Sequence, residues 1–260
     1  LTALFTAPVF GFVAPLAGSA DDESASGEIT IKLPKAQKTV VYGIAIAGGL
    51  GTYLLLGQLV GGGMGMPRFE SAEVGNLELV WLIPLALVGT VCGWLYFVSE
   101  HASEALSHAI GERPVVKAML AGLALAICGT VLPYTMFAGE TQADVLMETY
   151  LTIPAGVLIA TGLVKAMLTP ALINMGWRGG HFFPVIFSGV SLGYGLAILT
   201  GADPVFCVAV CTASTMGAVM RQPVMVVGLL LMCFPLKGIV CMIIAAAIAA
   251  GIPLPKPLRK

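Results

Sequence analysis

The chain has 260 residues, of which 58% are hydrophobic and 10% are charged, with a formal net charge of −1 and a mean hydropathy of +0.95. A water-soluble domain of this length needs far less apolar surface, so this composition excludes an ordinary soluble globular protein. The nearly neutral charge balance also excludes a broad nucleic-acid-binding surface, and no nucleic acid partner is expected. The composition predicts an all-α, polytopic membrane protein in contact with the lipid bilayer.

The chain begins inside an apolar segment. Its first residue is Leu1 rather than methionine, and no basic stretch precedes the apolar run. This start is not typical of a signal peptide. We therefore expect the sequence to be the later part of a longer protein.

Apolar segments follow one another along the whole chain, and Pro or Gly interrupts several of them. A membrane-spanning helix needs about 20 apolar residues, and broken helices are typical of channels and transporters. Two of the segments, 182–200 and 203–220, are near the lower limit, so we expect them to be tilted or to cross only partly. The predicted segments are 1–18, 39–63, 79–98, 115–138, 150–176, 182–200, 203–220 and 223–252.

The charged loops predict an orientation. Basic residues precede the segment at 39–63 and end the chain at 256–260, whereas acidic residues gather in the loops near 61–78 and 140–148. Lys and Arg favour the cytoplasmic side of a membrane. The expected location is therefore an integral, multi-pass protein of the plasma (inner) membrane with a cytoplasmic C-terminus.

A polar, glycine-paired break at 178–184 separates two long apolar segments and opens the second. A helix that starts here directs backbone N–H groups and the positive end of its dipole at the space before it. Two adjacent glycines allow a ligand to approach the main chain closely. These features favour a small-anion site, although tight helix packing is the ordinary explanation for a glycine in a membrane helix.

Four stretches carry a resemblance to a known family. Residues 4–11 read LFTAPVFG, residues 132–140 read LPYTMFAGE, residues 179–184 read GGHFFP, and residues 216–223 read MGAVMRQP. In content, order and separation these stretches resemble the ClC chloride channel and chloride/proton antiporter family. The resemblance covers essentially the whole chain, from late in the first half of the family's fold through nearly all of the second, and the N-terminal anion-binding motifs fall upstream.

The resemblance implies an inverted-repeat helical bundle with broken and tilted helices. Residues 1–260 would form a single transmembrane domain, with the end of the first repeat at 1–63 and the second repeat at about 79–260. It also implies a homodimer that moves small inorganic anions, most specifically chloride, along a pathway lined by helix N-termini. The anion-binding residues would be Gly179, Gly180, His181, Phe182 and Pro184, with Phe182 in the place of the family's pore-lining phenylalanine.

Departures from the family pattern favour a channel over strict proton-coupled exchange. The gating glutamate and the inner serine belong to motifs upstream of Leu1. The position of the antiporters' internal proton-transfer glutamate falls near Ala17 or Gly18, which cannot carry a proton, and that of the inner-mouth tyrosine falls near Pro255. A chloride/proton or fluoride/proton antiporter is the alternative, and a non-conducting structural membrane subunit is an alternative of another class.

The remaining polar residues have two interpretations each. His181 can couple anion movement to protons or act as a hydrogen-bonded spacer. At the junction with Pro223, Arg221 can attract anions into a vestibule or bind helix-terminal carbonyl groups. Lys165 and Arg178 lie near apolar ends, where we expect both side chains to extend toward the membrane surface.

Enzymatic and metal sites are not expected. His101 and His108 are seven residues apart on a polar stretch with interleaved acids, which favours a solvated helix end over a metal site. The sequence has neither an HExxH nor a GxSxG motif. We therefore predict no enzyme, no metal and no cofactor.

Overall fold

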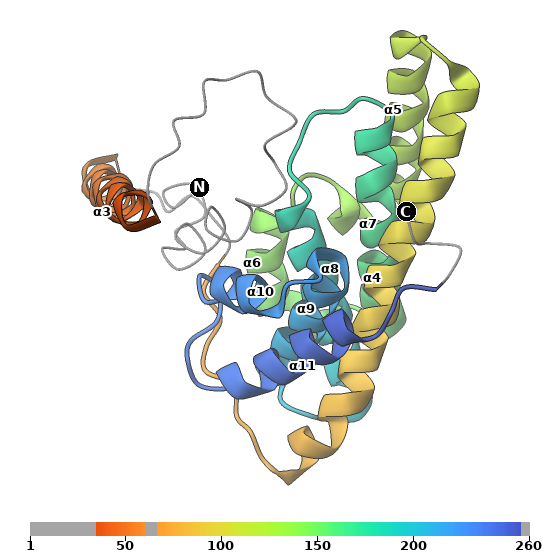
Figure 1. Ribbon diagram of the computed structural model, residues 1–260. Coiled ribbons are helices and arrows are strands. Elements are labelled where there is room, and N and C mark those ends of the chain that lie inside the picture. The colour runs from red at the N-terminus through yellow and green to blue at the C-terminus, as the bar shows by residue number, and fades with distance from the viewer. Residues whose placement is uncertain (1–34, 61–66, 256–260) are drawn as a thin grey trace. The chain divides into compact units, whose positions relative to one another are not determined.

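The computed structural model describes residues 35–60 and 67–255 (Figure 1). The predicted segment at 1–18, with Ala17 and Gly18, lies outside these residues. The chain divides into two compact units, residues 1–65 with 228–232 and residues 66–227 with 233–260. The first unit carries helix α3 (Lys35–Val60), and nearly all of the remaining described structure belongs to the second.

Helices form all the regular structure of the described residues, in agreement with the predicted all-α class. In the second unit these are α4 (Asn76–Ile110), α5 (Pro114–Val131), η3 (Pro133–Thr135), α6 (Glu140–Thr149), η4 (Tyr150–Thr152), α7 (Ala155–Asn174), α8 (Phe182–Thr200), α9 (Pro204–Met220) and α11 (Ile239–Gly251). Helix α10 (Pro223–Leu230) begins in the second unit and ends in the first.

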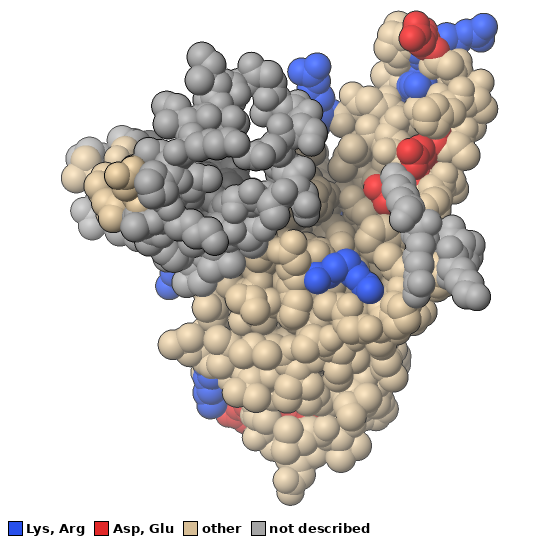
Figure 2. Space-filling model, in the orientation of Figure 1, with Lys and Arg blue, Asp and Glu red and all other residues tan. Residues whose placement is uncertain are grey.

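Four of the described helices, α4, α5, α7 and α8, are long and apolar enough to cross a membrane, and α9 and α11 are shorter apolar helices. The face shown in Figure 2 agrees with this assignment, because most of its described surface carries no charged side chain. A wide uncharged surface suits lipid contact, since a charged group in the bilayer costs about 2.5–3.5 kcal/mol. The structure therefore has the character of a multi-pass membrane domain.

Helix α8 lies at the centre of the second unit, packed between α7 and α9, while α9 also packs against α4 and α11. Glycine permits these close approaches. A Cβ atom added to Gly193 would lie 2.4 Å from the Val208 Cα of α9, and one added to Gly162 would lie 2.6 Å from the Ser188 carbonyl oxygen of α8. Small residues let membrane helices approach backbone to backbone, and this contact replaces the hydrophobic effect that lipid cannot supply.

The turn between α8 and α9 is held by acidic side chains. Gly201 ends α8 in the left-handed region, with φ of 70°. The Asp203 carboxylate accepts a hydrogen bond of 2.7 Å from the Phe206 N–H group and so caps α9. The Glu78 carboxylate of α4 accepts a 3.1 Å bond from the Asp203 N–H group. These contacts tie the start of α4 to the α8–α9 turn.

Four predicted segments differ from the structure. The segment predicted at 115–138 ends as α5 at Val131, and the segment predicted at 150–176 begins as α7 only at Ala155. The segment predicted at 79–98 continues as α4 to Ile110, because the polar stretch after it stays helical. The segment predicted at 223–252 is broken into α10 and α11. Pro235 lacks an N–H group, and Gly238 has a φ of 91°, so neither continues a helix. Apolar composition alone did not reveal this break.

The contact between α8 and α9 generates a prediction. We expect Gly193→Ala to lower the free energy of unfolding by about 1–3 kcal/mol, because the added methyl group meets the Val208 backbone and the helices must separate. Gly156→Ala in α7 is the matched control, since nothing lies within 4 Å of its added Cβ. Thermal unfolding of both variants in detergent measures the difference, and equal midpoints would contradict the packing argument.

Candidate functional site

The start of α8 follows a turn that contains adjacent glycines. The chain leaves α7 at Asn174, turns at Gly176 with φ of 92°, and enters α8 at Phe182. The first hydrogen bond along α8 runs from the Val185 N–H group to the His181 carbonyl oxygen, at 3.1 Å. Pro184 occupies the first turn, where its missing N–H group costs nothing. Regular helical hydrogen bonding therefore starts at His181, and the positive end of the helix dipole lies next to the preceding glycines.

Gly179 and Gly180 differ from the packing glycines of the core. An added Cβ on either residue would meet nothing within 4 Å, and neither residue has a positive φ. Within the part of the chain that the structure describes, their N–H groups donate to no acceptor. Neither steric crowding nor backbone conformation requires glycine at these positions, so what distinguishes them is an accessible main chain.

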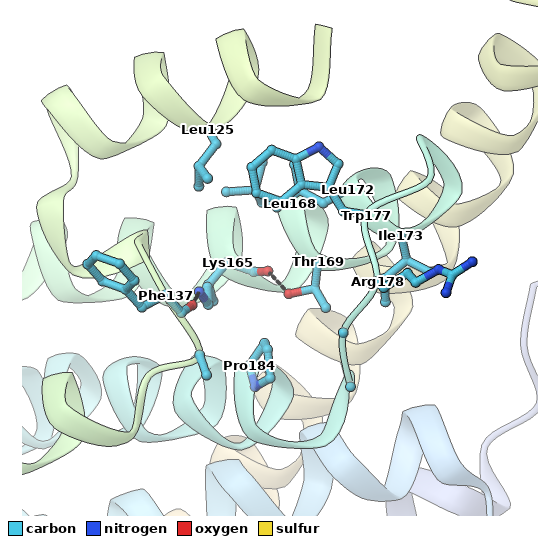
Figure 3. A pocket seen from close by; sticks show the side chains of 13 residues that line it. Leu125, Phe137, Lys165, Leu168, Thr169, Leu172, Ile173, Trp177, Arg178 and Pro184 are labelled. Atoms are coloured by element: carbon cyan, nitrogen blue, oxygen red, sulfur yellow. Dashed lines mark hydrogen bonds between the residues drawn. The ribbon is translucent and has the colours of Figure 1, made fainter. Parts of the chain in front are cut away.

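A cavity of about 260 Å³ lies against these two glycines (Figure 3). This volume holds a small ion together with several waters, each of which occupies about 30 Å³ in the liquid. Among the described residues, its wall contains two cationic residues and no acidic residue. It is lined by Leu125, Phe137, Ala138, Lys165, Leu168, Thr169, Leu172, Ile173, Trp177, Arg178, Gly179, Gly180 and Pro184. The cavity is therefore electrostatically suited to an anion.

Lys165 supplies a buried positive charge to this cavity. Its side chain is only 4% exposed. The ammonium group donates to the Thr135 carbonyl oxygen at 2.7 Å and to the Phe137 carbonyl oxygen. No carboxylate among the described residues pairs with it. An ammonium group has three donors and a full charge, so two neutral carbonyl groups leave one donor and the charge uncompensated.

The prediction that Lys165 extends toward the membrane surface is therefore wrong. Lys165 lies in the second half of α7, where the last residue of η3 and the turn after it come close and present the Thr135 and Phe137 carbonyl groups. These acceptors hold the ammonium inside the protein. Arg178 is exposed, and Figure 3 shows its guanidinium group directed away from Lys165.

The remaining residues of the proposed anion set lie in two different environments. Gly179, Gly180 and Pro184 line the cavity, whereas His181 and Phe182 do not. The His181 ring lies 4.4 Å from the Phe182 ring and 6.4 Å from the Tyr96 ring, measured between centroids. The segment before α8 thus presents glycine backbone to the cavity and the His181 ring to Tyr96 of α4.

Arg221 and Pro223 lie at the junction of α9 and α10, away from the cavity lining. Arg221 ends α9 with φ of 57°, and its Nη1 donates a 2.7 Å hydrogen bond to the Ile252 carbonyl oxygen beyond the end of α11. Pro223 is the first residue of α10. This contact gives Arg221 a structural role, because it satisfies a carbonyl group left by a helix end.

The polar end of α4 carries the two other histidines. His101 Nδ1 lies 3.0 Å from the Phe97 carbonyl oxygen one turn earlier, and His108 is exposed. Among the described residues, no group of three or more His, Cys, Asp or Glu side chains is placed to hold a metal ion.

Sequence reasoning identified the glycines but missed two other parts of the cavity region, the buried Lys165 and the stretch at 135–138 that binds it. The signal was present, because a lysine inside an apolar helix is costly and therefore marks a functional site by default. The turn had been noted only as part of the resemblance. The contact between Lys165 and the Thr135 and Phe137 carbonyl groups joins residues 28 and 30 positions apart.

Fold and site together define a polytopic helical membrane protein with a largely apolar cavity that carries two cationic residues before the start of α8. The sequence matches the family described as voltage gated chloride channel over residues 1–253. The chain therefore belongs to this family, which confirms the resemblance drawn from the four sequence stretches.

A solved structure supports the same fold. It is described as a crystal structure of a CLC-type fluoride/proton antiporter, with a TM-score of 0.65 and 19% sequence identity. The match covers 85% of this chain and 56% of that chain, so this chain spans little more than half the length of its structural neighbour. The comparison with curated proteins gave no match.

The open space at Gly180 generates a prediction that separates the site from the scaffold. Gly180→Ala is expected to leave the thermal midpoint unchanged, because its methyl group meets no atom within 4 Å. It should weaken the binding of a small anion about tenfold, the equivalent of roughly one charge-assisted hydrogen bond, because the methyl group restricts access to the main chain. Calorimetric titration of chloride measures this, with Gly156→Ala as control. Unchanged affinity would remove Gly180 from the site.

Proposed function

We propose that this protein moves small inorganic anions, chloride foremost, across a membrane along a pathway that passes the start of α8. One observation carries the proposal. Among the described residues the Gly179 and Gly180 amides have no acceptor, and these amides, the start of α8 and the buried Lys165 ammonium lie at one cavity whose described lining includes no acidic residue. Membership of the voltage gated chloride channel family supports the same conclusion.

The chemistry of the cavity wall suits weak, reversible binding of an anion. The amides contribute partial charges and the ammonium one full charge, while the opposite wall is apolar, with Leu125, Leu168 and Trp177. A mixed wall of this kind replaces part of the ion's hydration without enclosing it. The anion is held at Gly179, Gly180 and Pro184 with Lys165 behind it. His181 and Phe182 act from the side of α8 that faces α4.

Channel-like movement is favoured over strict proton-coupled exchange. Ala17 and Gly18 occupy the expected place of the internal proton-transfer glutamate, and neither carries a titratable side chain. A proton relay through a membrane protein needs titratable groups at intervals. The alternative is a chloride/proton or fluoride/proton antiporter, and the structural neighbour's description as a fluoride/proton antiporter supports keeping it.

The proposal includes a setting and partners. The protein is a transporter and not an enzyme, lies in the plasma (inner) membrane, and works as a homodimer with lipid around it. Family membership supports the dimer. Because this chain spans just over half of its structural neighbour, upstream segments are expected to complete the anion pathway.

Flux measurements on the complete protein in lipid vesicles test the proposal. Chloride or fluoride gradients are applied, and anion efflux is followed with ion-selective electrodes while internal pH is recorded. A channel gives anion movement without a fixed proton ratio, and an antiporter gives a fixed ratio. The absence of anion movement in either gradient would favour the structural membrane subunit and overturn the proposal.

Lys165 is expected to be essential for that flux. Lys165→Met keeps the apolar stem and removes the charge, so chloride flux should fall at least tenfold, a loss of about 1.4 kcal/mol of anion stabilisation. Lys237→Met is the control, because Lys237 is an exposed lysine in the segment before α11. Gel filtration and thermal unfolding verify that both variants are folded. Full flux in a folded Lys165→Met protein would show that the ammonium has only a structural role.

A further inference from the structure

The segment that follows α7 is a helix-capping motif that ends in a tryptophan. The Trp177 N–H group donates to the Leu172 carbonyl oxygen at 3.1 Å, and the Gly176 N–H group donates to the Ile173 carbonyl oxygen at 2.9 Å. Gly176 has a φ of 92°. Two such bonds around a left-handed glycine form a Schellman motif, which frequently includes a hydrophobic contact between the residue after the glycine and the last turn of the helix. The motif therefore fixes the backbone of Trp177 two residues before Gly179.

The Trp177 indole lies where α5 covers the cavity. A Cβ atom added to Gly122 of α5 would lie 3.9 Å from the Trp177 Cζ2 atom, and Trp177 lines the cavity together with Leu125 of α5. Figure 3 shows the indole beside Leu172 and across the cavity from Pro184. The indole is therefore part of the cavity wall on the α5 side, opposite the start of α8.

Little else closes the cavity on this side. Among the described residues, Leu125 is the one residue of α5 in the lining, and Ala121 is the one buried residue of that helix. The Trp177 side chain is 41% exposed, so the ring lies at the edge of the cavity rather than in the packed core. Trp has the largest side chain of the common residues, and a small side chain at this position would leave the space between α5 and α7 open.

We propose that Trp177 sets the upper size limit of the anions that enter this cavity. This inference rests on the proposed function and deepens it, because it assigns the choice among anions to an uncharged side chain. Lys165 and the glycine amides attract a small anion by charge, and that attraction does not depend on the anion's shape. A site rejects a larger competitor by a steric clash, and the indole is placed to supply one.

The relative flux of two anions in lipid vesicles tests this inference on the complete protein. Methanesulfonate carries the same single charge as chloride but is larger, so the indole and this anion compete for the same space. The vesicles contain the potassium salt of either anion. Valinomycin is added, and a potassium electrode then follows the efflux of potassium with its accompanying anion.

Trp177→Ala is expected to raise the ratio of methanesulfonate to chloride efflux about tenfold, within the discrimination that the shape of an apolar pocket gives. Trp177→Phe keeps an aromatic wall and should bring the ratio back toward the wild-type value. Trp81→Ala removes an indole from α4, outside the cavity lining, and is the matched control that should keep the wild-type ratio.

The outcomes separate this inference from the proposed function. An equal ratio in Trp177→Ala and Trp81→Ala, in a protein that moves chloride, would overturn the inference and leave the proposed function intact. If the wild-type protein moves neither chloride nor fluoride, the proposed function itself fails.

Fluorescence tests the position of the ring even if Trp177→Ala does not fold. Trp81→Phe and Trp94→Phe together leave Trp177 as the one tryptophan of the chain. Iodide quenches indole fluorescence on contact, so an anion bound against this ring should give quenching that saturates and that excess chloride relieves. Lys165→Met in the same background should remove the saturable part. Quenching that rises linearly with iodide in both proteins would show that the ring contacts no bound anion, and it would overturn the inference.

Discussion

Inside a bilayer, a break in a helix leaves backbone groups that neither lipid nor bulk water can satisfy, and this constraint organises the present structure. The end of η3 and the turn after it present the Thr135 and Phe137 carbonyl groups, and the Lys165 ammonium donates to both. The break before α8 presents N–H groups of the opposite polarity, at Gly179 and Gly180. The Lys165 ammonium satisfies the carbonyl groups at the first break, and its positive charge adds to the positive potential of the N–H groups at the break before α8.

The scaffold around these breaks depends on glycine for a different reason. Gly162, Gly189 and Gly193 bring α7, α8 and α9 into backbone contact, and a side chain at any of them would collide with the neighbouring helix. A Cβ atom added to Gly179 or Gly180 would have no atom within 4 Å. The same residue type therefore performs two tasks along one chain, helix packing in the core and main-chain exposure at the cavity, and only three-dimensional contacts distinguish them.

Much of the fold could be predicted from sequence, because apolar length and the GGHFFP break are local signals. The start of α8 at residue 182 and the turn around Gly201 follow from such signals. The break between α10 and α11 was missed, since the apolar run conceals Pro235 and Gly238. Lys165 was placed wrongly for a related reason. Its partners are carbonyl groups some 30 residues away, and a carbonyl group has no sequence signature.

The anchoring of Lys165 has a mechanical consequence. Because its ammonium is bound to main-chain oxygens rather than to a side chain, the charge cannot swing independently of the turn at Thr135 and Phe137. Phe137 has a φ of 58° and Gly139 a φ of 105°, so two residues of this turn lie in the left-handed region. Any displacement of the turn therefore moves the Lys165 ammonium with it. The electrostatic attraction between this ammonium and an anion in the cavity then depends on the position of the turn backbone.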